Sequence, residues 1–431
     1  MTELYLPEDI SFSCHQCGLC CSIFPSIPLD DLSARTLLQC DLERIPAARQ
    51  RLTDINDAVV AELRGESGLA LRKSPDGACV FHREDKLCEL HHVYGAQTKP
   101  QTCRDFPFRY RAAPDGVYVG LSFVCPSVRA NEGAPITQHR PALEEARVPA
   151  FGKSSVSEPV LLNPHISLSW KQYLAIEECM IRLLADRRLP LGRRLVACNI
   201  LLGFLDGWFR IAHGAHAPMD AARSMPDKTL DEFLAAVNRS DFADIRRAAS
   251  RSIRSPLLIR MFLGMVTSYG NLGGQRPRGR CGLVAGLIGQ YARHALGTGG
   301  VRLSPLAYRA THSLLKHSIF PSDGPALELV GRYLRHCVFR KDLVHVGTLT
   351  NGLNRMIINA ALIRWYSAAL AGSRHHDAPT YDDYSDAVLN VEKYYGFHSR
   401  VYQYFSEHAL LDEIMSNFMG RKNYPFIMLA D

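Results

Sequence analysis

Nine of the thirteen cysteines lie between residues 14 and 125, and the spacing of eight of them predicts metal chemistry. Four fall within eight residues, in the segment Cys14-His-Gln-Cys17-Gly-Leu-Cys20-Cys21. Thiolates crowded into so small a volume repel one another unless a soft cation neutralises their charge. The other four stand singly along the chain. We therefore predict that the metal ligands are Cys14, Cys17, Cys20, Cys21, Cys79, Cys88, Cys103 and Cys125.

The opening spacing differs from standard iron–sulfur motifs. Cys14, Cys17 and Cys20 match the first three ligands of a bacterial ferredoxin run, but Phe24 stands where that run expects its fourth cysteine. Eight thiols exceed the four that one tetrahedral zinc ion needs, and an adjacent cysteine pair serves two different metal atoms more easily than one. The residues therefore favour an iron–sulfur cluster, a 4Fe-4S cluster above all, and leave zinc as the alternative.

Two cations and four histidines accompany the cysteines. Lys99 and Arg104 could donate hydrogen bonds to thiolates or to cluster sulfides and so tune a bound cofactor from the second shell. For Arg104 the alternative is an ion pair with Asp105 or Glu89. Nearby imidazoles could be zinc ligands, although we interpret them as exposed or structural side chains: His15, His82, His91 and His92.

The cysteine pattern resembles the CxxCxxCC zinc- or iron-chelating family, the YkgJ-like cysteine-cluster proteins. The matching pieces are Cys14-x-x-Cys17-Gly18-Leu19-Cys20-Cys21, Cys79-Val-Phe, Cys88-Glu-Leu and Lys99-Pro100-x-x-Cys103-Arg104-Asp105-Phe106-Pro107. The family usually has arginine where this chain has Lys99. The resemblance covers residues from about 10 to about 130. It implies metal binding and does not decide between zinc and iron.

A cysteine cluster followed by a long helical region is also similar to the flagellin lysine N-methylase (FliB-type) family. The C-terminal part of this resemblance rests on the segment from Tyr333 to Arg340. It implies a protein-lysine N-methyltransferase that uses S-adenosylmethionine and acts on a protein, with flagellin as one candidate. The catalytic residues stay unassigned. The alternatives are a zinc-stabilised protein-binding module without catalysis and a redox or metal-transfer protein.

Length and composition limit the number of domains and the kinds of partner that we expect. The chain has 431 residues, 47% of them apolar, which suits two domains or one large one. The N-terminus, MTELYLPEDI, does not read as a signal peptide, and no unbroken apolar stretch has the length of a membrane span. We therefore expect a cytoplasmic protein with no membrane partner. The net charge of +7 is mild for this length and argues against nucleic acid as a partner.

Basic residues gather in two short segments, Arg239 to Arg260 and Arg276 to Arg280. We interpret the first as a solvated helix face and the second as a loop. The alternative is a docking surface for an acidic protein, a nucleotide or a phosphate.

The predicted fold class is mainly α, with an irregular cysteine-rich metal-binding N-terminal domain, residues 1–150, followed by an all-helical domain, residues 151–431. Within the first domain we expect an amphipathic helix from Leu29 to Leu63, broken near Pro46, and a strand from Val117 to Val124. A loop should follow from 131 to 164. Apolar stripes at helical spacing then predict helices after a cap at Ser167 or Ser169, at 191–211, 230–249, 256–269, 283–295, 327–338, 349–363 and 402–418.

Overall fold

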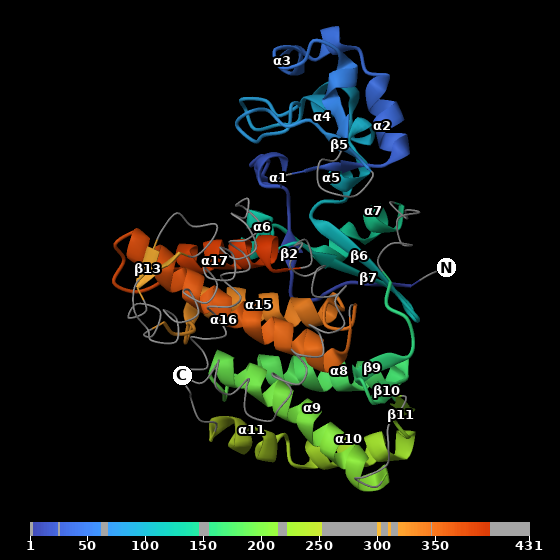
Figure 1. Cartoon of the computed structure of the whole chain (residues 1–431), viewed down its shortest axis with the longest axis vertical. Helices are drawn as coiled ribbons and strands as arrows, with labels where there is room; N and C mark the ends of the chain where they lie inside the picture. Colours follow the sequence, from blue (N-terminus) through green and yellow to red (C-terminus); the bar gives the residue numbers. More distant parts are fainter. Residues whose placement is uncertain are drawn as a thin grey trace, which may run out of the picture. The chain divides into compact units, whose positions relative to one another are not determined.

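The computed structural model describes residues 3–24, 26–61, 68–145, 155–213, 222–251, 300–302, 309–311, 318–345 and 347–396 (Figure 1). The chain divides into two compact units. Unit 1 comprises Met1–Pro7, Tyr110–Tyr118 and Glu144–Asp431, and unit 2 comprises Glu8–Arg109 and Val119–Leu143. The two-domain boundary near residue 150 stays a prediction, because compactness alone does not show which segments fold independently.

Unit 2 contains the eight predicted metal ligands and is built from short elements separated by turns. Its helices are α1 (Leu19–Ser22), α2 (Asp31–Leu38), α3 (Pro46–Arg49), α4 (Glu89–Tyr94), α5 (Gln101–Asp105) and α6 (Pro126–Ala130). Its strands form a three-stranded sheet in the order β3 (Pro28–Leu29), β5 (Leu69–Leu71), β4 (Val59–Ala61), and a pair, β2 (Ser11–Phe12) with β8 (Ala134–Pro135). This arrangement agrees with an irregular cysteine-rich N-terminal region.

The amphipathic helix expected from Leu29 to Leu63 is wrong in extent. Helix α2 ends at Leu38, and short 3-10 helices follow at Leu42–Arg44 and Ile55–Ala58. The side chains of Asp30, Asp41 and Asp54 each accept a backbone N–H at the start of one of these helices. Because each aspartate caps a new helix, the chain restarts rather than continuing one long helix.

A three-stranded sheet contains the strand expected at Val117–Val124. Strand β7 (Gly116–Leu121) is buried along its whole length and lies between β1 (Leu4–Tyr5) and β6 (Phe108–Ala113). Strand β1 pairs with β7 in parallel, through Leu4 opposite Val117 and Tyr5 opposite Tyr118. The strand prediction is thus confirmed, and its residues join the N-terminus to the rest of unit 1.

Long helices dominate the described part of unit 1. Helix α8 begins after Ser169, whose hydroxyl accepts the N–H of Gln172 in a capping box, so the predicted cap is confirmed. Helix α16 is buried over most of its length and packs against α9 and α17, while α15 packs against α8 and α17. These helices are α8 (Trp170–Ala185), α9 (Leu191–His213), α10 (Asp227–Arg239), α11 (Ala243–Ser250), α15 (Gly324–Phe339), α16 (Leu349–Ser373) and α17 (Tyr381–Tyr394), and the short helix α7 (Arg140–Glu145) begins in unit 2 and ends in unit 1.

The expectation that everything after residue 150 is helical is not confirmed. Three strands make a small sheet in the order β11 (Arg223–Ser224), β10 (Ile166–Leu168), β9 (Val160–Asn163), and β12 (Gly300–Arg302) pairs with β13 (Arg309–Thr311). Strand β9 alternates buried with half-buried residues, which is the strand period that the loop assignment missed. The predicted helices at 256–269, 283–295 and 402–418 lie outside the described residues.

The helix predicted at 230–249 is two helices. Helix α10 ends at Arg239 and α11 begins at Ala243, and the backbone of both Asp241 and Phe242 between them has a positive φ, 45° and 59°. This left-handed conformation breaks the helical hydrogen-bond ladder.

The sequence analysis found no unbroken apolar stretch long enough to span a membrane, but helix α9 has the length and mean hydropathy of such a span. By length and composition Leu191–Ala212 could cross a membrane, and it is the one such helix among the described residues. Half of its most apolar stretch is buried inside the structure.

Candidate metal centre

The cysteine loop turns sharply at Gly18. After β2 the chain runs without regular secondary structure, Gln16 has a positive φ of 53°, and Gly18 then adopts a left-handed φ of 69° immediately before α1. The N–H of Cys21 donates to the Gly18 carbonyl oxygen at 3.0 Å. Cys14, Cys17 and Cys20 are exposed, while Cys21 is half-buried. A residue without a side chain is required at this turn, because the left-handed region disfavours a Cβ.

Five of the eight predicted ligands gather in one place, which we call the larger thiol group: Cys20, Cys21, Cys79, Cys88 and Cys103. Cys79 belongs to a buried hydrophobic cluster that includes Leu37, Val80 and Phe81, and Cys21, Cys88 and Cys103 pack against that cluster. The N–H of Cys79 donates to the Cys21 carbonyl oxygen at 2.9 Å. Residues from α1, α4, α5 and the turn after β5 are thereby brought together.

The thiols of the larger group perturb one another's protonation. A hydrogen bond between Cys20 and Cys21 lowers the pKa of the Cys20 thiol to about 6 and raises the pKa of Cys21. Burial, with a smaller effect of the neighbouring thiolates, raises the pKa of Cys79 and of Cys103 to about 12. Of the five thiols in this group, Cys20 is therefore the one that would be largely ionised at neutral pH without a metal. Metal binding to the other four must release their protons.

The other three predicted ligands form the smaller thiol group: Cys14, Cys17 and Cys125. Cys125 precedes α6, and the hydroxyl of Ser127 on that helix donates to the Ser13 carbonyl oxygen at 2.7 Å. Burial raises the pKa of Cys125, and the nearby Cys17 and Cys14 thiolates raise it further. The cysteine loop therefore supplies thiols to two separate places.

Within the residues that the structure describes, no three His, Cys, Asp or Glu side chains converge closely enough to hold a metal ion as they stand. The donor set nevertheless fits zinc or iron, because eight soft thiols lie in two groups and one adjacent imidazole nitrogen is buried without a hydrogen bond, on His82. Burial, with the charge of Arg51, lowers the pKa of His82, so its ring is neutral at pH 7.

Lysine charges lie close to the larger thiol group. Lys99 lowers the pKa values of Cys20, Cys88 and Cys103, and its predicted role in tuning a bound cofactor stays a prediction. Lys73, which the sequence reasoning missed, donates from Nζ to the Cys21 carbonyl oxygen at 2.7 Å. Burial lowers the pKa of Lys73, opposed by the thiolates of the group. No local signal marks Lys73, since Cys21 lies 52 residues away.

Arg104 turns towards the backbone rather than to sulfur. Its guanidinium donates to the carbonyl oxygens of Gln97 and Lys99, at 2.7 Å and 3.0 Å, and to the side chain of Gln101. The alternative partner Glu89 instead accepts the backbone N–H groups of Ala47 and Ala48. Arg104 thus holds the segment that carries Lys99, and its role at a cofactor stays a prediction.

The remaining histidines lie elsewhere. His15 contacts Glu132 at 3.3 Å between Nε2 and a carboxylate oxygen. His91 and His92 are exposed on α4. The scattered cysteines Cys179, Cys198 and Cys337 are buried in α8, α9 and α15 as packed thiols, and Cys281 lies outside the described residues.

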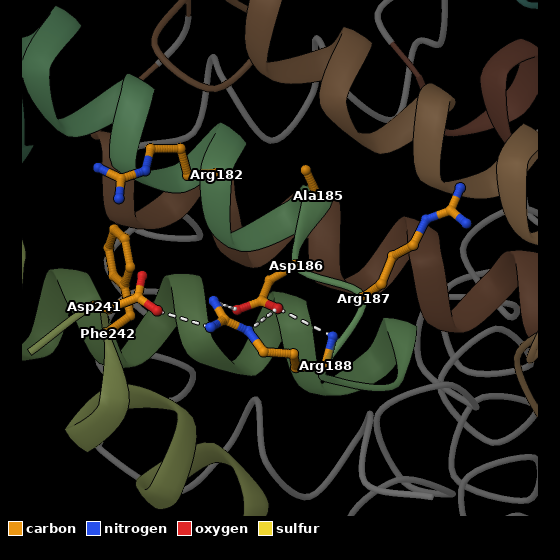
Figure 2. A pocket seen from close by; sticks show the side chains of 7 residues that line it. All are labelled: Arg182, Ala185, Asp186, Arg187, Arg188, Asp241 and Phe242. Carbon is orange, nitrogen blue, oxygen red and sulfur yellow. Dashed lines mark hydrogen bonds and ion pairs between the residues drawn. The ribbon is translucent and has the colours of Figure 1, made fainter.

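Away from the cysteines, charged side chains line a pocket of about 390 Å³ at the end of α8 (Figure 2). Arg188 pairs with Asp186 at 2.8 Å and with Asp241 at 2.7 Å, and Arg246 pairs with the same two carboxylates at 3.3 and 3.5 Å. Aspartates therefore neutralise these guanidinium groups. In its described part, the arginine-rich segment stabilises the junction of α8, α10 and α11. Arg254 and the second basic segment lie outside the described residues.

The comparison with protein families agrees with the cysteine geometry. Residues 13–125 match the CxxCxxCC family model, described as a "Putative zinc- or iron-chelating domain". The match covers the region that holds all eight predicted ligands, and about a quarter of the chain. No curated protein and no solved structure matches this chain. The comparisons thus support zinc or iron chelation by the cysteine region and lend no support to a link with flagellin methylases.

Proposed function

We propose that residues 13–125 bind zinc or iron through cysteine thiolates, and that the larger thiol group holds a 4Fe-4S cluster. This proposal rests on four thiols that lie in or against one hydrophobic cluster, those of Cys21, Cys79, Cys88 and Cys103, with Cys20 hydrogen-bonded to Cys21. One tetrahedral zinc ion takes four ligands, whereas Cys20 and Cys21 are adjacent and serve two metal atoms more easily than one. The nearby charges of Lys73 and Lys99 suit a site with several thiolates, since they offset its negative charge.

Metal analysis of protein purified without oxygen tests this proposal. We expect about four iron and four acid-labile sulfide per chain, the composition of a cubane cluster held by cysteine thiolates. One or two zinc ions without sulfide would instead favour a zinc-stabilised binding module. Protein that binds neither metal would overturn the proposal.

Cysteine variants test the division of the thiols. We expect Cys88→Ser to abolish the iron–sulfur absorption, because it removes a ligand of the larger group, and Cys125→Ser to leave that absorption in place. Cys40→Ala is the matched control, since Cys40 lies in the same hydrophobic cluster but its Sγ faces the Thr36 carbonyl oxygen at 3.7 Å. Equal loss in the Cys88 and Cys125 variants would contradict the division into two groups.

For the whole chain we infer a protein-modifying enzyme that transfers methyl groups to lysine side chains. The similarity of sequence order to the flagellin lysine N-methylases supports this proposal, and the redox or metal-transfer protein is the alternative. In such a reaction the neutral ε-amine attacks the methyl carbon of S-adenosylmethionine, the carbon–sulfur bond breaks and the amine then loses a proton. Incubation with labelled S-adenosylmethionine and flagellin should label lysine. Absence of label with metal-loaded protein would favour the redox alternative.

A further inference from the structure

His82 lies between two cysteines of the larger thiol group. Its backbone N–H donates to the Cys79 carbonyl oxygen at 2.9 Å, and it is paired with Cys88 in an antiparallel bridge. Residues that face each other in an antiparallel pair project their side chains to the same side. The imidazole of His82 and the thiol of Cys88 therefore share one side of the chain.

The free nitrogen of this imidazole faces the turn of the cysteine loop. Nε2 of His82 is buried and makes no hydrogen bond to the described residues. A Cβ placed on Gly18 would lie 2.4 Å from this nitrogen, so Nε2 points at the backbone between Cys17 and Cys20. The carbonyl oxygen of Lys86 lies by the same point and raises the pKa of His82, although Nε2 meets no acceptor at full hydrogen-bond geometry. A buried polar atom without a partner is destabilising, and a ligand at this place would satisfy it.

We propose that His82 is a nitrogen ligand, through Nε2, to the metal that the larger thiol group holds. The inference rests on the proposed metal binding and adds a mixed nitrogen and sulfur ligand set. Imidazole and thiolate together bind both zinc and iron, and imidazole replaces thiolate on iron in some iron–sulfur centres. The other histidines of unit 2 near the cysteines are exposed or contact Glu132, which leaves His82 as the candidate.

Spectroscopy of the full-length protein tests this ligand directly. For iron-loaded protein, pulsed electron paramagnetic resonance should show a ¹⁴N coupling that becomes a ¹⁵N coupling when histidine is labelled. For zinc-loaded protein, X-ray absorption should show one nitrogen among the sulfur neighbours. His82→Ala should remove the nitrogen signal, whereas the matched variant His92→Ala, in an exposed residue of α4, should retain it.

The outcomes separate this inference from the proposed function. Metal bound through sulfur alone in the wild-type protein would overturn the His82 ligand and leave metal chelation standing. A chain that binds no metal would refute both. If His82→Ala does not fold, labelling of the wild-type protein still decides, and His82→Cys should restore a donor with all-sulfur ligation. A nitrogen coupling that survives in His82→Cys would also overturn the assignment.

Discussion

Gly18 shows how one residue shapes the cysteine loop. Its backbone has a φ of 69°, and the space beside its Cα is filled by the His82 ring and the Lys86 backbone. Gly77, in the turn between β5 and Cys79, has a similar φ of 83° but open space beside it. The two glycines share the same conformational demand and differ in their surroundings.

Alanine at these two positions should therefore have different effects. Gly77→Ala should lower the free energy of unfolding by about 1–2 kcal/mol, the strain of a left-handed backbone. Gly18→Ala should lose about 1–3 kcal/mol more through overpacking against His82, and should bind less metal. Chemical denaturation and metal analysis of both variants measure this. Equal losses of stability and metal would show that His82 does not fill the space beside Gly18.

Also at the scale of single residues, Lys341 is a fully buried cation in unit 1. Its ammonium forms an ion pair with Glu177 and lies 3.8 Å from the centre of the Tyr118 ring. Tyr173 donates its hydroxyl to the same carboxylate. Burial lowers the pKa of Lys341 and raises the pKa of Glu177, and each charge opposes the effect of burial on the other.

Removal of one partner of this pair should be strongly destabilising. Lys341→Met leaves the Glu177 carboxylate buried without its cation, which should lower the free energy of unfolding by about 3–5 kcal/mol. The double variant Lys341→Met with Glu177→Gln should recover most of that loss, because it removes both charges. Urea denaturation of the single and double variants provides the measurement. A double variant as unstable as the single one would mean that packing, not charge, determines the loss.

At the scale of elements, an ion-pair network joins the end of α8 to the break between α10 and α11. Asp186, nearly buried, accepts from Arg188, as Figure 2 shows, and also from Arg246. The hydrogen bond from Arg188, more than any other favourable contact, lowers the pKa of Asp186. Because the pKa of Asp186 is lower in the folded than in the unfolded chain, the network stabilises the fold fully at pH values above about 4, the pKa of an unfolded aspartate. This stabilisation is lost as the pH falls through the lower pKa of the folded state.

Asp186→Asn should therefore be destabilising in a pH-dependent way. At pH 7 we expect a loss of about 1–2 kcal/mol, typical of hydrogen bonds to a charged group. The difference from wild type should shrink as the pH falls below about 4, where the wild-type carboxylate also becomes protonated. The control is Asp244→Asn, since Asp244 and its partner Arg247 are exposed, and it should change stability by less than about 0.5 kcal/mol. A constant difference between pH 7 and pH 3 would contradict this account.

At the scale of the whole molecule, the chain order and the compact units do not coincide. Unit 1 takes β1 and the segment Tyr110–Tyr118 from the N-terminal part of the chain. Within that segment Arg111 contacts Asp342 at 3.6 Å, and Tyr118 covers Lys341. A fragment that begins at residue 151 lacks both side chains.

We expect the fragment 151–431 to unfold at a lower temperature than the full chain, because the charged turn after α15 loses the cover of Tyr118 and Arg111. A Tyr118→Ala variant of the full chain should show part of the same decrease. Thermal unfolding monitored by circular dichroism measures both proteins. A fragment as stable as the full chain would support a domain boundary at residue 150.

The sequence alone indicated zinc or iron chelation by cysteines and the type of the long helices. Four thiols within eight residues predict metal binding whatever the fold around them, although the structure divides these four between the two thiol groups. The stripe after Ser169 predicts α8 because a capping residue and an apolar period of 3.6 are local properties. The three aspartate caps between residues 30 and 54 are also local signals, but their short helices were hidden within a longer apolar pattern.

Only the tertiary structure decided which side chains meet. The contact of Lys73 with Cys21 and that of His82 with Gly18 each join residues that are far apart along the chain. Each of the two thiol groups likewise brings together cysteines from distant parts of the chain. Local spacing carries no information about such contacts, because they depend on how the turns between short elements are closed. The strands β9 and β10 were missed for the same reason, since a strand of three or four residues is stabilised by its partner rather than by its own sequence.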